Sequence, residues 1–247
     1  MRKTVFANDE YYHVYNRGVD KREVFLNEGD YVRFLTYLRE FNDNSTYEQR
    51  IFLKNQKNIK SSSKELSSCI QELSSLEESQ PSVEIIAYCL SPNHYHLILK
   101  QLVENGVKIF MHKLGTGYTN YFNKKYQRSG SLFQGPFKAI HIDSNEYLLL
   151  LSAYVNRNYF IHGYQGEDLG TKSPSGGSVP TPMQDEWKYC SALEYLGKRN
   201  GTLCKKEIVL NQFGQLGSES RASYAEFLDV NANYFRDKKE LQKYILE

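Results

Sequence analysis

An α+β fold is predicted by three features of the 247-residue chain. Up to Phe160, β-prone runs and amphipathic stretches follow one another in the order strand, helix, strand, strand, helix, strand, helix. The two adjacent strands are joined by the short turn Ser91-Pro92-Asn93, so they pair as a hairpin. The 40% of hydrophobic residues suffices for a buried core and excludes a disordered or collagen-like chain. This order is that of the split βαβ, or ferredoxin-like, arrangement: a four-stranded antiparallel sheet with helices on one face, followed here by one extra helix.

Each element has its own local signal. The strands are rich in β-branched and aromatic residues, and the helices place apolar residues three and four apart, after residues such as Asn27, Asp143 or Ser144 that can cap them. Strands are expected at 11–15, 83–90, 94–100 and within 132–142, and helices at 27–41, 103–127 and 145–159.

The chain divides into a core and two additions. The core is expected at 1–162, interrupted by a polar insertion at 42–82 that contains ten serines. Residues 163–182 are rich in Gly, Pro and Ser and are interpreted as a linker. Short helical patterns within 183–247 predict a small helical C-terminal appendage.

Composition excludes several protein classes. No run of 18 apolar residues exists and the N-terminus has no apolar signal region, so we expect neither a membrane span nor secretion. The four cysteines form no CxxC pair and fit reduced thiols better than a disulfide or zinc framework. The expectation is a soluble, cytoplasmic protein.

Two histidines open the second strand of the hairpin. Because side chains alternate along a strand, His94 and His96 point to the same face, with Tyr95 on the other. This spacing suits two imidazoles that converge on one metal ion. The alternative is structural: one histidine in a polar contact and the other at the surface.

A tyrosine and an amide share a face of the last core helix. Tyr154 and Asn158 are four residues apart, one helical turn, so the Asn158 oxygen can join a metal while the Tyr154 hydroxyl lies beside it. The tyrosines at 118, 121, 126, 147 and 159 have no such partner four residues on. The alternative for Tyr154 is a half-buried helix aromatic.

The charge of the chain is concentrated in one segment. The whole chain carries +2, but residues 105–142 contain six basic residues and no acid, so the remainder carries −4. Aromatic residues are interleaved with these cations, as single-stranded nucleic acid binding requires. A core helix with a solvated basic face is the competing interpretation. The candidate nucleic-acid contacts are Arg17, Lys108, Lys113, Lys124, Lys125, Arg128, Phe133 and Lys138.

Three motifs in one order resemble a known family. PNHYHLIL at 92–99 resembles the HUH motif (His, hydrophobic, His) of single-tyrosine nucleases. RSGSLFQGPFKA at 128–139, followed by AYVNRN at 153–158, resembles the REP-associated tyrosine transposases, relatives of the insertion-sequence single-tyrosine transposases. Some relatives carry a histidine where this chain has Asn156, so a ligand role for position 156 is not expected.

The resemblance implies an activity. His94, His96 and Asn158 are implied as metal ligands and Tyr154 as the nucleophile, and these donors suit Mg²⁺ or Mn²⁺. The implied reaction is cleavage and joining of single-stranded DNA through a covalent 5′-phosphotyrosine, as in DNA transposition. The implied partner is DNA with a hairpin, of REP-like or element-end sequence, bound by a monomer or a homodimer.

Two other functions remain open from the sequence. One is a non-catalytic protein, derived from a transposase, that binds structured single-stranded DNA or RNA. The other is a metal-dependent hydrolase that uses water, with a purely structural Tyr154.

Overall fold

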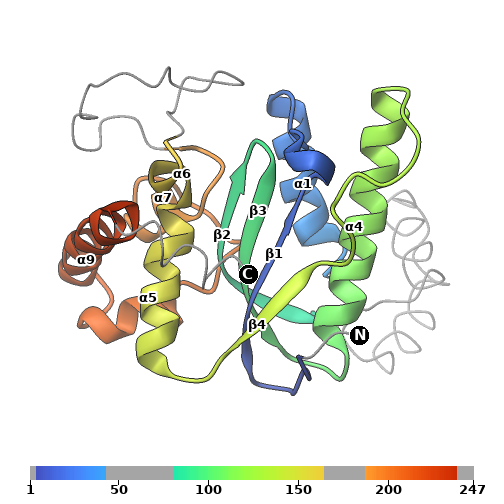
Figure 1. The fold of residues 1–247 in the computed structure, drawn as a ribbon. Helices are drawn as coiled ribbons and strands as arrows, with labels where there is room; N and C mark the ends of the chain where they lie inside the picture. Colours follow the sequence, from blue (N-terminus) through green and yellow to red (C-terminus); the bar gives the residue numbers. More distant parts are fainter. Residues whose placement is uncertain (1–3, 43–80, 164–186, 238–247) are drawn as a thin grey trace, which may run out of the picture.

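A four-stranded antiparallel sheet forms the centre of the computed structural model, which describes residues 4–42, 81–163 and 187–237 (Figure 1). The strand order is β2-β3-β1-β4, which is the ferredoxin-like order and confirms the predicted fold class. The strands are β1 (Tyr11–Arg17), β2 (Val83–Ser91), β3 (His94–Gln101) and β4 (Lys138–Ile142).

Helices cover both faces of this sheet. The helices α1 (Glu28–Glu40) and α4 (Gly106–Lys125) pack on one face, and α5 (Asn145–Asn156) packs on the other (Figure 1). The expectation of helices on a single face is therefore correct for α1 and α4 and wrong for α5. The reason lies in β2, which is buried at almost every position and so needs cover on both sides.

Close packing accounts for a glycine in the middle of α4. A Cβ atom on Gly117 would lie 2.5 Å from the Phe41 ring, so α1 and α4 can approach each other this closely only because residue 117 has no side chain.

Hydrogen bonds connect the end of α1 to the start of β2. The Asn42 side chain donates to the Val83 carbonyl (2.8 Å) and accepts from the Val83 amide (3.0 Å), while Ser82 N–H donates to the Asn42 carbonyl.

The last core helix is interrupted once. The Ser144 hydroxyl caps α5 by accepting from the Tyr147 amide, as predicted. At Arg157 the backbone leaves helical values (φ −112°, ψ 10°), and the short helix α6 (Asn158–Ile161) follows. The predicted helix 145–159 is thus two helices.

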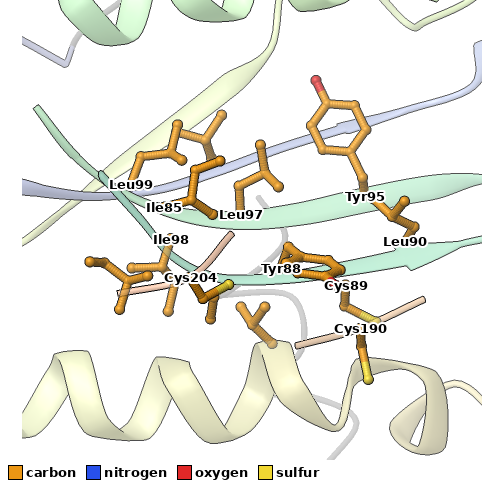
Figure 2. Packing of buried hydrophobic residues seen from close by; sticks show 14 of the residues in the cluster. Ile85, Tyr88, Cys89, Leu90, Tyr95, Leu97, Ile98, Leu99, Cys190 and Cys204 are labelled. Atoms are coloured by element: carbon orange, nitrogen blue, oxygen red, sulfur yellow. The ribbon is translucent and has the colours of Figure 1, made fainter. Parts of the chain in front are cut away.

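The C-terminal residues form a layer over β2 and α5. This part contains α7 (Ala192–Tyr195), α8 (Glu207–Leu210), the 3₁₀ turn η2 (Asn211–Phe213) and α9 (Ser218–Asp237). The backbone at Cys190 forms an isolated antiparallel β-bridge with Cys89 at the edge of β2, and both cysteines are free thiols (Figure 2). In this bridge, Leu90 N–H donates to the Tyr189 carbonyl and Ser191 N–H donates to the Tyr88 carbonyl. The predicted C-terminal helices therefore share one hydrophobic core with the sheet.

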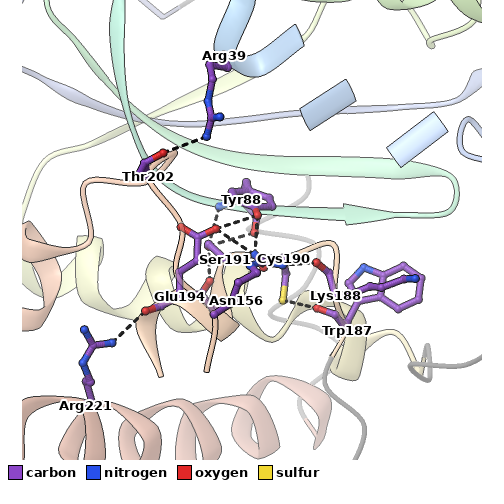
Figure 3. A network of polar contacts seen from close by, with 11 residues as sticks. Arg39, Tyr88, Asn156, Trp187, Lys188, Cys190, Ser191, Glu194, Thr202 and Arg221 are labelled. Atoms are coloured by element: carbon purple, nitrogen blue, oxygen red, sulfur yellow. Dashed lines mark hydrogen bonds and ion pairs between the residues drawn. The ribbon is translucent and has the colours of Figure 1, made fainter. Parts of the chain in front are cut away.

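A buried polar network attaches this layer to α5. The Ser191 hydroxyl donates to Asn156 Oδ1 (2.5 Å), and Asn156 Nδ2 donates to the Tyr224 hydroxyl on α9 (2.8 Å). Figure 3 shows the network around Ser191, with Arg221 of α9 donating to the Glu194 carbonyl. Asn156 thus links α5 to both Ser191 and α9.

Parts of the predicted additions lie outside the described residues. These are residues 43–80 of the insertion, residues 164–182 of the linker, and residues 183–186 and 238–247 of the C-terminal appendage. In the part of the chain that the structure describes, no helix is long and apolar enough to cross a membrane.

Candidate active site

His94 and His96 lie together on the α5 face of β3. Their ring centroids are 5.2 Å apart at 86°, and both side chains are buried. Tyr95 points to the opposite face, where its ring contacts Phe34 and Phe133. The alternation predicted for this strand thus brings the two imidazoles to one place.

The Asn158 amide closes the site from α6. His94 Nε2 lies 3.0 Å from Asn158 Oδ1, and the same oxygen accepts from the Ser91 hydroxyl (3.1 Å). On its other side, His94 Nδ1 lies 2.6 Å from Asn93 Oδ1, which can only accept. Burial, with a smaller effect from His162, lowers the pKa of His94 to about 3, so its imidazole is neutral at pH 7.

A neutral imidazole has one N–H, and for His94 the contact with Asn93 takes it. The Nε2 lone pair then faces the Asn158 oxygen at 3.0 Å, so two electron pairs converge on one point. Such an arrangement is stabilised by a cation between or beside them. These donors therefore fit a divalent metal ion with nitrogen and amide oxygen ligands.

His96 has a further unpaired ring nitrogen near His94 among the described residues. Its Nδ1 lies 2.9 Å from His13 Nε2, whereas its Nε2 is buried without a hydrogen-bond partner among the described residues. Burial lowers the pKa of His96 well below its usual value, so this imidazole is neutral as well. Within residues 4–42, 81–163 and 187–237, no three His, Cys, Asp or Glu side chains form a metal site.

Tyr154 lies beside the histidines and beneath α9. Its ring centroid is 5.5 Å from that of His96, at 89°, and 5.3 Å from that of Phe235. The side chain is 0% exposed, and burial raises the pKa of its hydroxyl. The Asn158 amide is near enough to oppose this shift, but no side chain or backbone group of the described residues makes a hydrogen bond of normal geometry to the hydroxyl. The fold brings together all four residues singled out from the sequence and encloses them.

Residues 44–158 match the family model described as "Transposase IS200 like", and this range contains both histidines, Tyr154 and Asn158. This part of the chain is therefore similar to the IS200-like transposases. A solved structure of a REP-associated tyrosine transposase bound to a REP hairpin also matches, at 11% identity and a TM-score of 0.38, over 74% of this chain and 94% of that one. No curated protein sequence matches the chain.

Two of the predicted nucleic-acid residues lie at the histidine site. Arg17 is exposed at the end of β1, directly opposite His94, and it contributes to the lowered pKa of both His94 and His162. Lys138 is exposed at the start of β4, with Nζ 5.9 Å from the centre of the Tyr15 ring, which stacks on His96.

The other predicted contacts lie on or after α4, on the opposite face of the sheet: Lys108, Lys113, Lys124, Lys125, Arg128 and Phe133. Lys125 donates to Asp30 at 2.6 Å, and Asp30 is buried, so an internal ion pair already accounts for this charge. Phe133 is 7% exposed and packs against Tyr95 and Tyr118. A stacking face on Phe133 and a free charge on Lys125 are expectations that the structure does not support, because Phe133 is packed against other rings and Lys125 is paired with Asp30.

Two further histidines lie at the site and were not predicted from the sequence. His13 lies on β1 and contacts His96, and the His162 ring is 5.2 Å from that of His94. His162 follows Asn158 by four residues, the same spacing that drew attention to Tyr154, so extending that spacing by one turn finds it. His13 had only a weak signal, a histidine inside an otherwise aromatic and apolar strand.

Proposed function

We propose that this chain is a metal-dependent single-stranded DNA endonuclease and strand transferase that cleaves beside hairpins through a covalent bond to Tyr154. The observation that supports this proposal most is the contact of His94 Nε2 with the Asn158 oxygen at 3.0 Å, beside the His96 ring at 5.2 Å from His94 and at 5.5 Å from the Tyr154 ring. Among the described residues, His96 Nε2 has no hydrogen-bond partner. Four residues from β3, α5 and α6 with these contacts are more than a binding protein needs.

The proposed reaction exchanges one phosphate ester for another. The Tyr154 oxygen attacks the phosphorus, the bond from phosphorus to the 3′ oxygen breaks, and the proton of the phenol is balanced by the one that the 3′-OH gains. Mg²⁺ or Mn²⁺ held by His94, His96 and Asn158 would supply positive charge beside the phosphate as a Lewis acid. Because the ester bond is conserved, a 3′-OH can reverse the step and join strands without a nucleotide cofactor.

Exposed basic side chains indicate where the DNA backbone would bind. Arg17 and Lys138 are exposed at the histidine side of the sheet, where they can bind the phosphates next to the one that is cleaved. We assign Lys108, Lys124 and Arg128, on and after α4, to the more distant hairpin stem. Two phosphate-binding regions on opposite faces of the sheet fit a substrate that joins a duplex to a single strand.

A covalent-trapping experiment tests the proposal. Full-length protein is incubated with Mn²⁺ and a labelled pool of single-stranded genomic DNA, and protein–DNA adducts are separated on a denaturing gel and mapped to a peptide. The expected adduct is at Tyr154, is absent in EDTA and with Tyr154→Phe, and persists with Tyr147→Phe, a half-buried tyrosine of the same helix.

One observation favours a second function. Tyr154 is 0% exposed beneath Phe235, as expected of a protein that binds structured DNA or RNA without cleaving it. Hairpin binding with no adduct at any tyrosine would select this function. Cleavage that survives Tyr154→Phe would select a hydrolase that uses water.

A further inference from the structure

His13 is a buried histidine that the proposed reaction leaves without a role. It lies on β1 and is 0% exposed, and its ring nitrogen Nε2 lies 2.9 Å from His96 Nδ1. Its Nδ1 has no hydrogen-bond partner among the described residues. At 2.9 Å the two nitrogens share a hydrogen bond, so one of them donates and the other accepts.

A hydrogen bond between two neutral imidazoles contains one proton, which leaves two arrangements. If His96 Nδ1 carries the proton, it donates to His13 and leaves the lone pair of His96 Nε2 free. If His13 Nε2 carries the proton, His96 must hold its own proton on Nε2, which removes that lone pair. Only the first arrangement leaves His96 able to bind a metal.

We infer that His13 is a positioning residue: its Nε2 accepts the Nδ1 proton of His96 and thereby fixes the tautomer and orientation in which His96 Nε2 is a ligand. This inference rests on the proposed metal site. Metal-bound histidines generally donate their second N–H to an acceptor that orients the ring, and here a neutral imidazole from the neighbouring strand occupies that place.

The β-sheet itself sets this contact. β1 and β3 pair so that Tyr15 lies opposite His96, and His13, two residues earlier on the same strand, reaches His96 diagonally. The His13 and His96 rings are nearly parallel, at 17° with centroids 5.1 Å apart. The two strands therefore hold both rings, and no loop movement is required to bring the acceptor to His96.

Amide variants test the inference through metal affinity. The terminal oxygen of glutamine can reach the position of His13 Nε2, whereas the shorter asparagine cannot. Mn²⁺ binding to the full-length protein is measured by electron paramagnetic resonance without DNA. We expect His13→Asn to weaken Mn²⁺ binding about 10- to 100-fold and His13→Gln to retain it within about threefold. His141→Gln, an exposed histidine of β4, is the matched control and should bind as the unaltered protein does.

The controls separate this inference from the proposed function. If Mn²⁺ binding by the unaltered protein is insensitive to His94→Ala, the metal site itself is wrong. If His94→Ala abolishes binding but His13→Asn binds normally, only the role of His13 is wrong. Nitrogen-15 NMR of the unaltered protein with Mg²⁺ needs no variant to fold: a proton on His96 Nδ1 supports the inference, and a proton on Nε2 overturns it.

Discussion

Removing the Tyr154 hydroxyl should stabilise the protein while it abolishes the proposed adduct. This hydroxyl is buried and has no hydrogen bond of normal geometry to any described residue. Burying a hydroxyl without a partner costs about 1–3 kcal/mol, and Tyr154→Phe removes that cost and keeps the ring against His96 and Phe235. We expect a gain of about 1 kcal/mol in the free energy of unfolding, or about 2–4 °C in Tm.

Tyr118→Phe is the matched control. Tyr118 is equally buried, but its hydroxyl donates to the Val24 carbonyl at 2.6 Å. This change leaves the carbonyl unpaired and should cost about 1–3 kcal/mol while the adduct persists. Urea unfolding and the covalent-trapping gel measure the two effects on the same samples. Tyr154→Phe that destabilises as much as Tyr118→Phe would refute the reasoning, because the Tyr154 hydroxyl would then have a partner.

Three further predictions concern the ligands, the α1–α4 ion pair and the basic face. His94→Ala should abolish the adduct but change hairpin affinity, measured by filter binding, by less than about tenfold, or about 1.4 kcal/mol; a larger loss would place His94 in DNA binding. Burial raises the pKa of Asp30, but hydrogen bonds led by Lys125 outweigh it and hold the pKa below its usual value. The stability that Asp30 provides is therefore complete above its unfolded pKa, near 3.9, and is lost as the pH falls through the lower folded pKa. Asp30→Asn should lower the free energy of unfolding by about 2 kcal/mol at pH 7 and by less at pH 2. An equal loss at both pH values would contradict this explanation. Replacing Lys124 and Arg128 together with Ala should flatten the salt dependence of DNA binding by a log–log slope of about 0.7–0.9 for each phosphate that the protein no longer neutralises, whereas an unchanged slope would leave a solvated face.

The sheet and the site could be predicted because their signals are local. Alternation along one strand puts His94 and His96 on one face, and one helical turn separates Tyr154 from Asn158. Tyr154 and Asn158 both reach the site although the helix is interrupted at Arg157 between them. After the interruption, Asn158 still lies within 3.0 Å of His94.

What could not be predicted depends on partners far away in the sequence. The charge of Lys125 is neutralised by Asp30, from a different helix, and Phe133 packs on rings from β3 and α4. The contact of His13 with His96 requires the register of β1 on β3, which no local pattern contains. Likewise, the position of Phe235 over Tyr154 follows from how the C-terminal layer packs.

The join between Asn42 and Val83 has a practical consequence for engineering. Residues 42 and 82–83 are hydrogen-bonded to each other, since Ser82 N–H donates to the Asn42 carbonyl and the Asn42 side chain bonds to the Val83 backbone. This point is at the end of β2 that pairs with Gln101, and the candidate site is at the other end, where Ser91 pairs with His94. An insertion at this junction would therefore join the core at the end of the sheet away from His94, so a fluorescent reporter or an affinity module attached there should have little effect on the site.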